Sequence, residues 1–391
     1  MYEKYFYYVV IIILRYMNNL KKKLYSKILE MAYWSDSKKK KEIFDGYGYY
    51  YIRLMNKRGA HYFKDSLTRE EKKAVKKVWG TAGEKSSSFS FYKQYCGYFS
   101  PYFVPDDYYR FAEDVLNMRW GASFLQHKCN LKYFIPKTNR AEVIIQKIDG
   151  HICCEDNTEV SMQDAVSRLK QKSTFVYKIA RGTGGGKSVR KVDLDEVEDK
   201  DMFLEKLLSP EDIEIENLVY QSSWMAQFNQ DSVNTIRMLT LNINGRCTVL
   251  SSFLRMGAKG SFVDNLSGGH GVLVGVNDEG FLNEFGINRG MERKTESPTG
   301  VVFDKKCIPD FELIKKQIVD YHTKIPYANL IGWDVALDEN NNPIILEINL
   351  DSALVEAHQI FNGPIFGERL LEVQDYIERR KPSLKHRIIV Y

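Results

Sequence analysis

The sequence predicts an α+β protein in which a mostly helical N-terminal extension precedes two regions that mix helices and strands. Two hairpin patterns carry this prediction. Strand-like runs over 233–243 and 246–256 flank Asn244-Gly245, the dipeptide that most strongly favours a two-residue hairpin. A second pair of runs, over 332–337 and 343–350, flanks a turn made of Asp, Glu and Asn. Helix and strand patterns also alternate from about Phe124 onward.

The length and composition are those of a globular chain with more than one domain. The chain has 391 residues, of which 44% are hydrophobic and 27% charged, and this excludes a disordered chain, a collagen and a coiled coil. We expect an N-terminal helical segment, a helical and loop-rich domain, two mixed subdomains and a short tail. Their expected bounds are 1–45, 46–123, 124–220, 221–380 and 381–391.

The distribution of charge argues against a nucleic-acid partner. The formal net charge is +5, but the first 41 residues alone hold ten Lys or Arg and three Asp or Glu. The remainder is therefore close to neutral, whereas a nucleic-acid-binding domain is usually basic over its binding surface. The six cysteines form no Cys-x-x-Cys pair, so we expect free thiols, no zinc site and a reducing, cytoplasmic compartment.

The N-terminal segment has two interpretations. Residues 5–14 are apolar or aromatic and lysines follow, but the run is shorter than the ~20 residues that span a bilayer. It is either a buried element with a solvated basic tail, or an anchor through which residues 5–27 contact the inner membrane surface. A signal peptide is not favoured, because the positive charge lies mostly behind the apolar run.

Three helices are expected from local patterns. From Leu67 onward a capping box opens a helix, in which Thr68 can cap while Glu71 reaches back. Residues 80–105 are a loop-rich junction with one short buried element. Further helices are expected over 106–118 and over 311–323.

A glycine-rich loop between two strands is interpreted as a flexible phosphate-binding lid. A strand over 175–180 leads into Arg-Gly-Thr-Gly-Gly-Gly-Lys-Ser, and a second strand follows over 188–192. A P-loop would have glycine at the position of Arg181 and would open a helix. Bare backbone N–H groups can close over phosphates, although a mobile surface turn is the alternative. The expected phosphate contacts are Lys178, inside the entering strand, and Gly182, Gly184, Gly185, Gly186 and Lys187.

The second hairpin brings oxygen ligands together. Glu347 and Asn349 are two residues apart, so both point to one face of their strand, and Asp334 can face them from the other strand. Oxygen ligands suit Mg²⁺, which substrate phosphates and water complete. The alternative is a polar stripe that faces solvent.

Together these motifs resemble the ATP-grasp superfamily, over about residues 126–377. The resemblance is greatest to the D-alanine–D-alanine ligase-like branch and to sugar-transfer-associated ATP-grasp proteins. It implies the ATP-grasp fold, in which two α+β subdomains grip ATP between them. It also implies that Lys128 and Lys178 are the two phosphate-binding lysines and that Asp334, Glu347 and Asn349 are the metal ligands.

Two positions depart from the family pattern. At the adenine hinge, where many members carry an acidic residue, the strand-like run 218–221 offers Gln221. Gly332 stands where the D-alanine ligases carry an arginine, and Arg237 or Arg255 can supply that cation.

The resemblance implies a ligase that uses ATP and one or two Mg²⁺ ions to join a carboxylate to an amine through an acyl phosphate. The substrates expected are small molecules, for example an amino acid and a sugar acid, in cell-surface polysaccharide or envelope biosynthesis. Arg237, Arg255 and His270 are the expected catalytic residues, although His270 is equally well a structural residue of a glycine turn. Asp264 and Asn265 are interpreted as turn-formers. A kinase that phosphorylates a hydroxyl, and a nucleotide-binding module without turnover at the membrane, are the alternatives.

Overall fold

The computed structural model describes residues 65–84, 88–117, 119–180, 188–209, 212–264, 271–351 and 353–387. The chain divides into two compact units, 1–51 and 52–391, and every described residue belongs to the second. The predictions for residues 1–45, including the membrane contact through 5–27, therefore lie outside the described residues. Within the described ranges, no helix is both long enough and apolar enough to cross a membrane.

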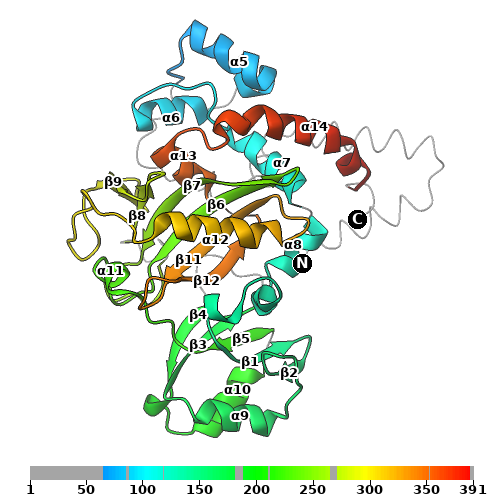
Figure 1. The fold of residues 1–391 in the computed structure, drawn as a ribbon, viewed down its shortest axis with the longest axis vertical. Coiled ribbons are helices and arrows are strands. Elements are labelled where there is room, and N and C mark those ends of the chain that lie inside the picture. Colours follow the sequence, from blue (N-terminus) through cyan, green and yellow to red (C-terminus); the bar gives the residue numbers. More distant parts are fainter. Residues whose placement is uncertain are drawn as a thin grey trace, which may run out of the picture. The chain divides into compact units, whose positions relative to one another are not determined.

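The N-terminal part of the second unit is helical, as expected. Thr68 and Glu71 form the predicted capping box, since the backbone N–H of Thr68 donates to Glu71 Oε2 at 2.7 Å and that of Glu71 donates to Thr68 Oγ1 at 3.2 Å. The junction after Gly80 contains the buried helix α6. The helices before the first sheet are α5 (Arg69–Glu84), α6 (Ser88–Cys96), α7 (Asp106–Leu116) and α8 (Arg119–Leu125) (Figure 1).

Helix α7 ends where its backbone turns extended at Asn117. The Asn117 side chain donates to the carbonyl oxygens of Leu330 and Leu350, each at 2.7 Å. The helical extension is thereby tied to the hairpin that carries the predicted metal ligands.

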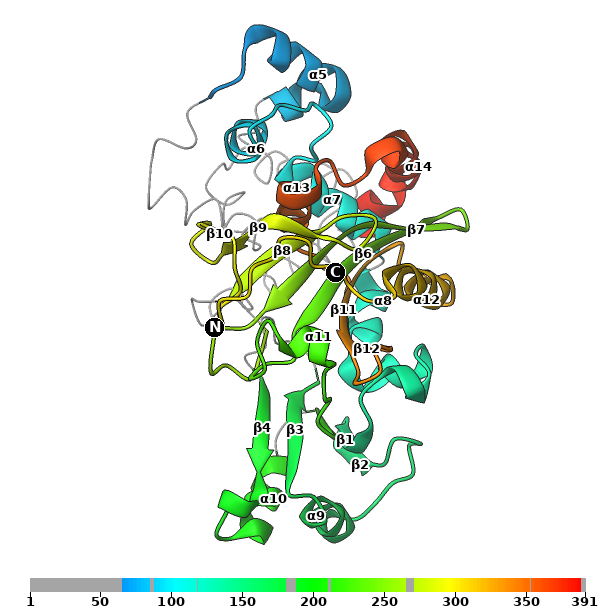
Figure 2. The ribbon, with the colours of Figure 1, turned by 60° about the vertical axis from the view of Figure 1, so that its left-hand side comes forward.

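A small antiparallel sheet follows, with strand order β2-β1-β5-β3-β4 among the described residues. Its apolar face packs on α9 (Met162–Lys170) and α10 (Lys200–Leu208), where Phe175, Ile213 and Ile215 are buried (Figure 2). The strands are β1 (Val143–Ile148), β2 (His151–Cys153), β3 (Thr174–Ile179), β4 (Val189–Asp193) and β5 (Ile213–Glu216). Short 3₁₀ helices lie at Lys128–Tyr133 (η1), Lys137–Asn139 (η2) and Leu194–Glu196 (η3).

A larger antiparallel sheet has the strand order β10-β9-β8-β7-β6-β11-β12 among the described residues. The strands are β6 (Thr235–Ile243), β7 (Arg246–Met256), β8 (Val272–Val276), β9 (Leu282–Asn288), β10 (Arg293–Lys294), β11 (Leu330–Leu337) and β12 (Pro343–Asn349). The remaining elements are α11 (Ser223–Ala226), α12 (Phe311–Thr323), α13 (Val355–Asn362), η5 (Gly367–Arg369) and α14 (Leu370–Arg387). Helix α14 continues without a break past residue 380, where we expected a tail to begin.

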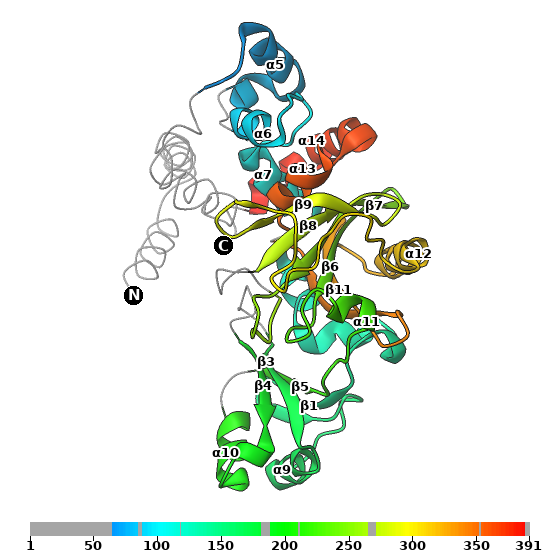
Figure 3. The same cartoon turned by 90° about the vertical axis from the view of Figure 1, so that its left-hand side faces the viewer.

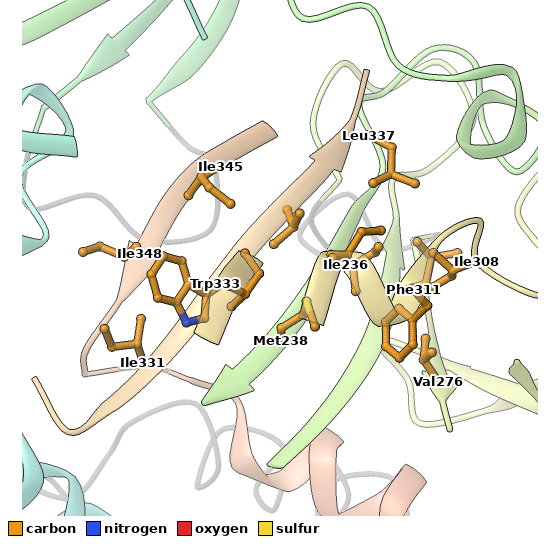
Figure 4. Close-up of a cluster of buried hydrophobic side chains, with 14 of the residues drawn as sticks. Ile236, Met238, Val276, Ile308, Phe311, Ile331, Trp333, Leu337, Ile345 and Ile348 are labelled. Carbon is orange, nitrogen blue, oxygen red and sulfur yellow. The ribbon is translucent and has the colours of Figure 1, made fainter. Parts of the chain in front are cut away.

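Helices cover both faces of the larger sheet. Helix α12 covers one face, on which Trp333, Ile348 and Met238 are buried with Phe311 of the helix (Figure 4). Helices α7, α13 and α14 lie on the other side (Figure 3), where Leu239 and Leu330 belong to a second buried cluster. These helices pack on only part of that face, and the rest carries polar side chains.

The two hairpins and the helix over 311–323 are confirmed. Asn244 and Gly245 have φ values of 53° and 80°, the left-handed conformation that a type I′ turn requires. Strands β3 and β4 pair antiparallel, so the chain around the glycine-rich loop runs strand, loop, strand, as predicted. The expected strand over 218–221 is wrong: residues 218–220 form no regular structure, and Gln221 makes only an isolated bridge to Asp338.

Candidate active site

The polar face of the larger sheet gathers five of the predicted site residues. Side chains alternate across a strand, so Trp333 faces α12 while Asp334 faces the opposite side. Asp334 is the cross-strand partner of Arg237 on β6 and of Glu347 on β12, and cross-strand partners share a face. Asn349 and Arg255 reach the same face through their partners, Gly332 and Thr235.

Asp334 binds both predicted arginines. Arg237 donates to it through Nε and, at 3.0 Å, through Nη2. Arg255 donates through Nη1 to both carboxylate oxygens, at 2.9 and 3.0 Å. All three side chains are at least nine-tenths buried. Burial raises the pKa of Asp334, but the two arginines outweigh burial and hold it at about 2. The carboxylate is therefore ionised at neutral pH.

Asp264 also belongs to this network, although the sequence indicated only a turn-forming residue at this position. Its Oδ1 accepts from Arg255 Nη2 at 3.2 Å, and its Oδ2 accepts from the hydroxyl of Thr235. Burial raises the pKa of Asp264, while Arg255 opposes that shift. The sequence gives little indication that Asp264 pairs with Arg255, because only the tertiary fold brings the chain after β7 back to the end of that strand.

Lys128 reaches the same face from a different element. Its Nζ lies 3.0 Å from Oε1 of Glu347. The 3₁₀ helix η1 holds Lys128 there, and the Lys128 backbone N–H donates to the carbonyl of Ala180 at the end of β3. The first predicted phosphate-binding lysine thus lies beside both a predicted metal ligand, Glu347, and the residue that precedes the glycine-rich loop.

Lys178 pairs with an acidic residue on the neighbouring strand. Its Nζ lies 2.5 Å from Oε2 of Glu216, and both side chains are more than nine-tenths buried. Glu214 lies on the same face of β5, where Gln146 donates to it at 2.7 Å. Burial, and then the neighbouring Glu216, raise the pKa of Glu214 to about 8.

Glu214 and Glu216 were absent from the sequence-based site. The signal that could have found them is the alternation Ile-Glu-Ile-Glu over 213–216, which places both acids opposite the buried isoleucines. Because Lys178 is the cross-strand partner of Glu214, the acids lie on the face that carries this lysine.

The donor set at Asp334, Glu347 and Asn349 fits a hard divalent cation. The two carboxylates and the Asn349 amide lie on one face, and oxygen ligands are those that Mg²⁺ prefers. The amide nitrogen of Asn349 now donates to Asp334 at 3.5 Å, so the amide would turn its oxygen toward a bound cation. Over the described ranges, no cluster of three or more His, Cys, Asp or Glu side chains could hold a metal ion by itself. A cation here would therefore depend on the amide and on ligands supplied by a bound nucleotide.

The two positions that depart from the family pattern have close contacts with the chain around them. Gln221 Nε2 donates to the carbonyls of Asn229 and Ser232, and its Oε1 accepts from the Asn234 N–H. This side chain is thus occupied in holding the loop before β6. Gly332 lies against Ala353, where an added Cβ would be 3.3 Å from the Ala353 Cα, so the arginine that the D-alanine ligases carry would have to displace this neighbour.

His358 and Gln359, which follow β12, pack into the protein. His358 is fully buried with Nδ1 2.8 Å from Ser251 Oγ, and Gln359 bonds the backbone of Val104 in both directions. Burial first, and then Arg237, hold the pKa of His358 well below its usual range. Among the other predicted residues, His270 and residues 182–187 lie outside the described part of the chain.

Comparison with known proteins gives one family match. The sequence model of the family described as sugar-transfer associated ATP-grasp matches residues 143–375, which is more than half of the chain. This match confirms the ATP-grasp fold that the motifs suggested. No curated protein matches the sequence.

Solved structures of ATP-grasp ligases are similar at low identity. The ligase PsnB, complexed with a minimal precursor, is 11% identical with a TM-score of 0.39, covering 67% of this chain and 64% of that one. D-alanyl-alanine synthetase A from Vibrio cholerae is 13% identical with a TM-score of 0.36, covering 65% of each chain. The chain thus spans less than two thirds of the length of each of these ligases.

Proposed function

The chain belongs to the sugar-transfer associated ATP-grasp family, and from this premise we propose that it is an ATP- and Mg²⁺-dependent carboxylate–amine ligase. The observation that supports the proposal is that cationic and carboxylate side chains form ion pairs at one face of the larger sheet. Arg237, Arg255 and Lys128, cations suited to phosphate, contact Asp334 and Glu347, carboxylates suited to a metal. A structural polar stripe would not require five charged side chains, of which four are nine-tenths buried.

In this proposal the chain's own residues hold the charges of phosphoryl transfer. Lys128 and Lys178 exchange their carboxylate partners for oxygens of the α- and β-phosphates, and backbone N–H groups of residues 182–186 close over them. Mg²⁺ bound by Asp334, Glu347 and Asn349 would neutralise charge on the β- and γ-phosphates. Arg237 and Arg255 then stabilise the transferred phosphoryl group, as cations do in phosphoryl transfer generally.

The proposed reaction has two balanced steps. The substrate carboxylate oxygen attacks the γ-phosphorus, the bond to the β–γ bridging oxygen breaks, and ADP leaves. The amine nitrogen then attacks the acyl carbon, orthophosphate leaves, and the amine loses a proton as the amide forms. Water must be excluded between the steps because it would hydrolyse the acyl phosphate. We further propose small-molecule substrates, such as an amino acid and a sugar acid, and a role in polysaccharide or envelope biosynthesis in the cytoplasm.

Nucleotide binding is the first test. A ligand that binds only the folded state stabilises it by about 2.7 kcal/mol at 100 times its Kd. We expect ATP with Mg²⁺ to raise the melting temperature of the wild type, and Lys128→Met to lose most of that rise. Lys128 suits this test because its partner Glu347 is 34% exposed and stays solvated when the lysine is removed. Lys200→Met is the matched control, since the Lys200 side chain is 37% exposed and its partner Asp195 is more exposed still.

Product analysis then separates ligation from the alternatives. A ligase releases orthophosphate only when both a carboxylate and an amine are present, whereas a kinase transfers phosphate to a hydroxyl and releases none. The absence of any shift with ATP, ADP or GTP would contradict the proposal before a substrate is sought.

A further inference from the structure

Arg255 lies between two carboxylates and binds each through a different nitrogen. Nη1 donates to Asp334 at 2.9 and 3.0 Å, and Nη2 donates to Asp264 at 3.2 Å. The side chains of Arg255, Asp334 and Asp264 are 10%, 9% and 16% exposed. A guanidinium is planar with separate donors on each nitrogen, so it can release one carboxylate while it keeps the other.

Asp264 is held in place independently of Arg255. The hydroxyl of Thr235 donates to its second oxygen, and Thr235 is the cross-strand partner of Arg255 itself. Thr235, Arg255 and Asp264 are therefore adjacent at one end of β6 and β7. Asp264 is fixed from the Thr235 side while its other oxygen holds Arg255.

A divalent cation and Arg255 compete for the same carboxylate. If Asp334 binds the cation proposed above, it cannot keep both arginines in their present hydrogen bonds. Arg255 is buried, and a buried cation that loses its partner is strongly destabilising. The only acid that a described contact places on the far side of Arg255 is Asp264.

We propose that Asp264 is a positioning residue that takes Arg255 over from Asp334 when a divalent cation binds. This inference rests on the proposed function, because it requires Asp334 to be a metal ligand. Asp264 touches neither the metal nor the substrate in this role and acts only through Arg255. Without its charge, Arg255 has Asp334 as its remaining carboxylate, and the arginine then excludes the metal more strongly.

The test measures metal affinity rather than turnover. Mn²⁺ is titrated into the full-length protein with saturating ADP, and free Mn²⁺ is read by electron paramagnetic resonance. We expect Asp264→Asn to weaken Mn²⁺ binding at least fivefold. Thr235→Val, which keeps the shape but removes the hydroxyl, should weaken it in the same direction, and Thr235→Ser should restore it. Asp278→Asn, in the exposed β8–β9 turn, is the control and should stay within twofold of the wild type.

A double variant separates positioning from simple charge. Removing the negative charge of Asp264 could also weaken Mn²⁺ binding directly, by long-range electrostatics. That direct effect would persist when Arg255 is absent. Positioning through Arg255 predicts instead that Asp264→Asn changes Mn²⁺ affinity less than twofold in an Arg255→Gln background. If Arg255→Gln does not fold, the comparison of Thr235→Val with Thr235→Ser still decides, because neither changes a charge.

Two results would overturn the inference alone. One is Mn²⁺ affinity within twofold of the wild type in both Asp264→Asn and Thr235→Val. The other is an equal loss with and without Arg255. Wild-type protein that binds neither ADP nor Mn²⁺ would instead overturn the proposed function, and this inference with it.

Discussion

The Nζ of Lys128 lies 3.0 Å from Oε1 of Glu347, although 219 residues separate them in the chain. A group proposed to bind phosphate thus neutralises a group proposed to bind metal. Asp334 repeats this arrangement with Arg237 and Arg255. In the proposed function, nucleotide and metal therefore break the same ion pairs, so the binding of one frees the groups that bind the other. This relationship predicts that the two bind cooperatively.

Glu347→Gln should uncouple the nucleotide from the metal. Without the carboxylate, Lys128 is free for phosphate and no negative charge faces it. We therefore expect metal-free ATP to bind about tenfold more tightly, or about 1.4 kcal/mol, while added Mg²⁺ improves affinity less than in the wild type. Calorimetric titration with ATP, in EDTA and in Mg²⁺, measures both changes. Glu339→Gln, in the exposed β11–β12 turn, is the control. Unchanged affinity in EDTA would contradict the coupling.

Lys178→Met should destabilise the protein, and a second substitution should reverse the effect. Lys178 and Glu216 form a buried pair, and removal of one partner from such a pair costs about 3–5 kcal/mol. Lys178→Met/Glu216→Gln removes the unpaired charge and should recover most of the lost stability. Urea unfolding at pH 8 gives the free energies. If the double variant is no more stable than Lys178→Met, the pair is not the source of the loss.

His322 should make the protein less stable in mild acid. It is fully buried between Thr240 Oγ1, at 2.6 Å, and the Ala328 carbonyl, at 2.9 Å. Burial lowers its pKa to about 4, against an ordinary value of 6.5. Above pH 6.5 the ring is neutral in the folded and unfolded chain, so it adds no pH dependence. Between pH 6.5 and 4 only the unfolded chain takes up the proton.

From this ring alone, the free energy of unfolding should therefore fall with decreasing pH in that window, by at most about 1.4 kcal/mol per pH unit. Urea unfolding between pH 7.5 and 4.5 measures the slope. His322→Gln should be less stable at every pH but should lose the part of the slope that one proton contributes. The exposed His151→Gln variant should keep the wild-type slope. Equal slopes in His322→Gln and the wild type would contradict the assignment.

Gly332→Val should disturb both packing and the metal ligands. An added Cβ would lie 3.3 Å from the Ala353 Cα, which is tight, and 3.5 Å from the Asn349 Cβ, which is an ordinary contact. Overpacking of this kind costs about 1–3 kcal/mol of unfolding free energy. We also expect weaker Mn²⁺ binding, because the branched side chain would occupy space next to the predicted ligand Asn349. Gly121→Ala, inside helix α8, is the control. An added Cβ there would lie 3.8 Å from the nearest atom, Tyr327 Cβ, so this change should not lower the free energy of unfolding.

Local patterns determined much of the fold. The hairpin at Asn244-Gly245 follows from two residues that tolerate positive φ, and the capping box at Thr68 needs only atoms within one turn of chain. The shared face of Glu347 and Asn349 follows from strand alternation. In each case the interacting groups are near in sequence or the period is fixed by backbone geometry, so a single sequence contains the information.

The partners of the charged groups required the tertiary structure. Nothing local to Lys178 indicates Glu216, and nothing local to Arg255 indicates Asp264 as an anion rather than a turn residue. The strand expected over 218–221 is absent because β5 ends at Glu216, and the Gln221 amide hydrogen-bonds to loop backbone. Contact of Gln221 with the adenine stays a prediction. Ion pairs depend on which strands become neighbours and on what is buried between them, and only the packed sheets decide that.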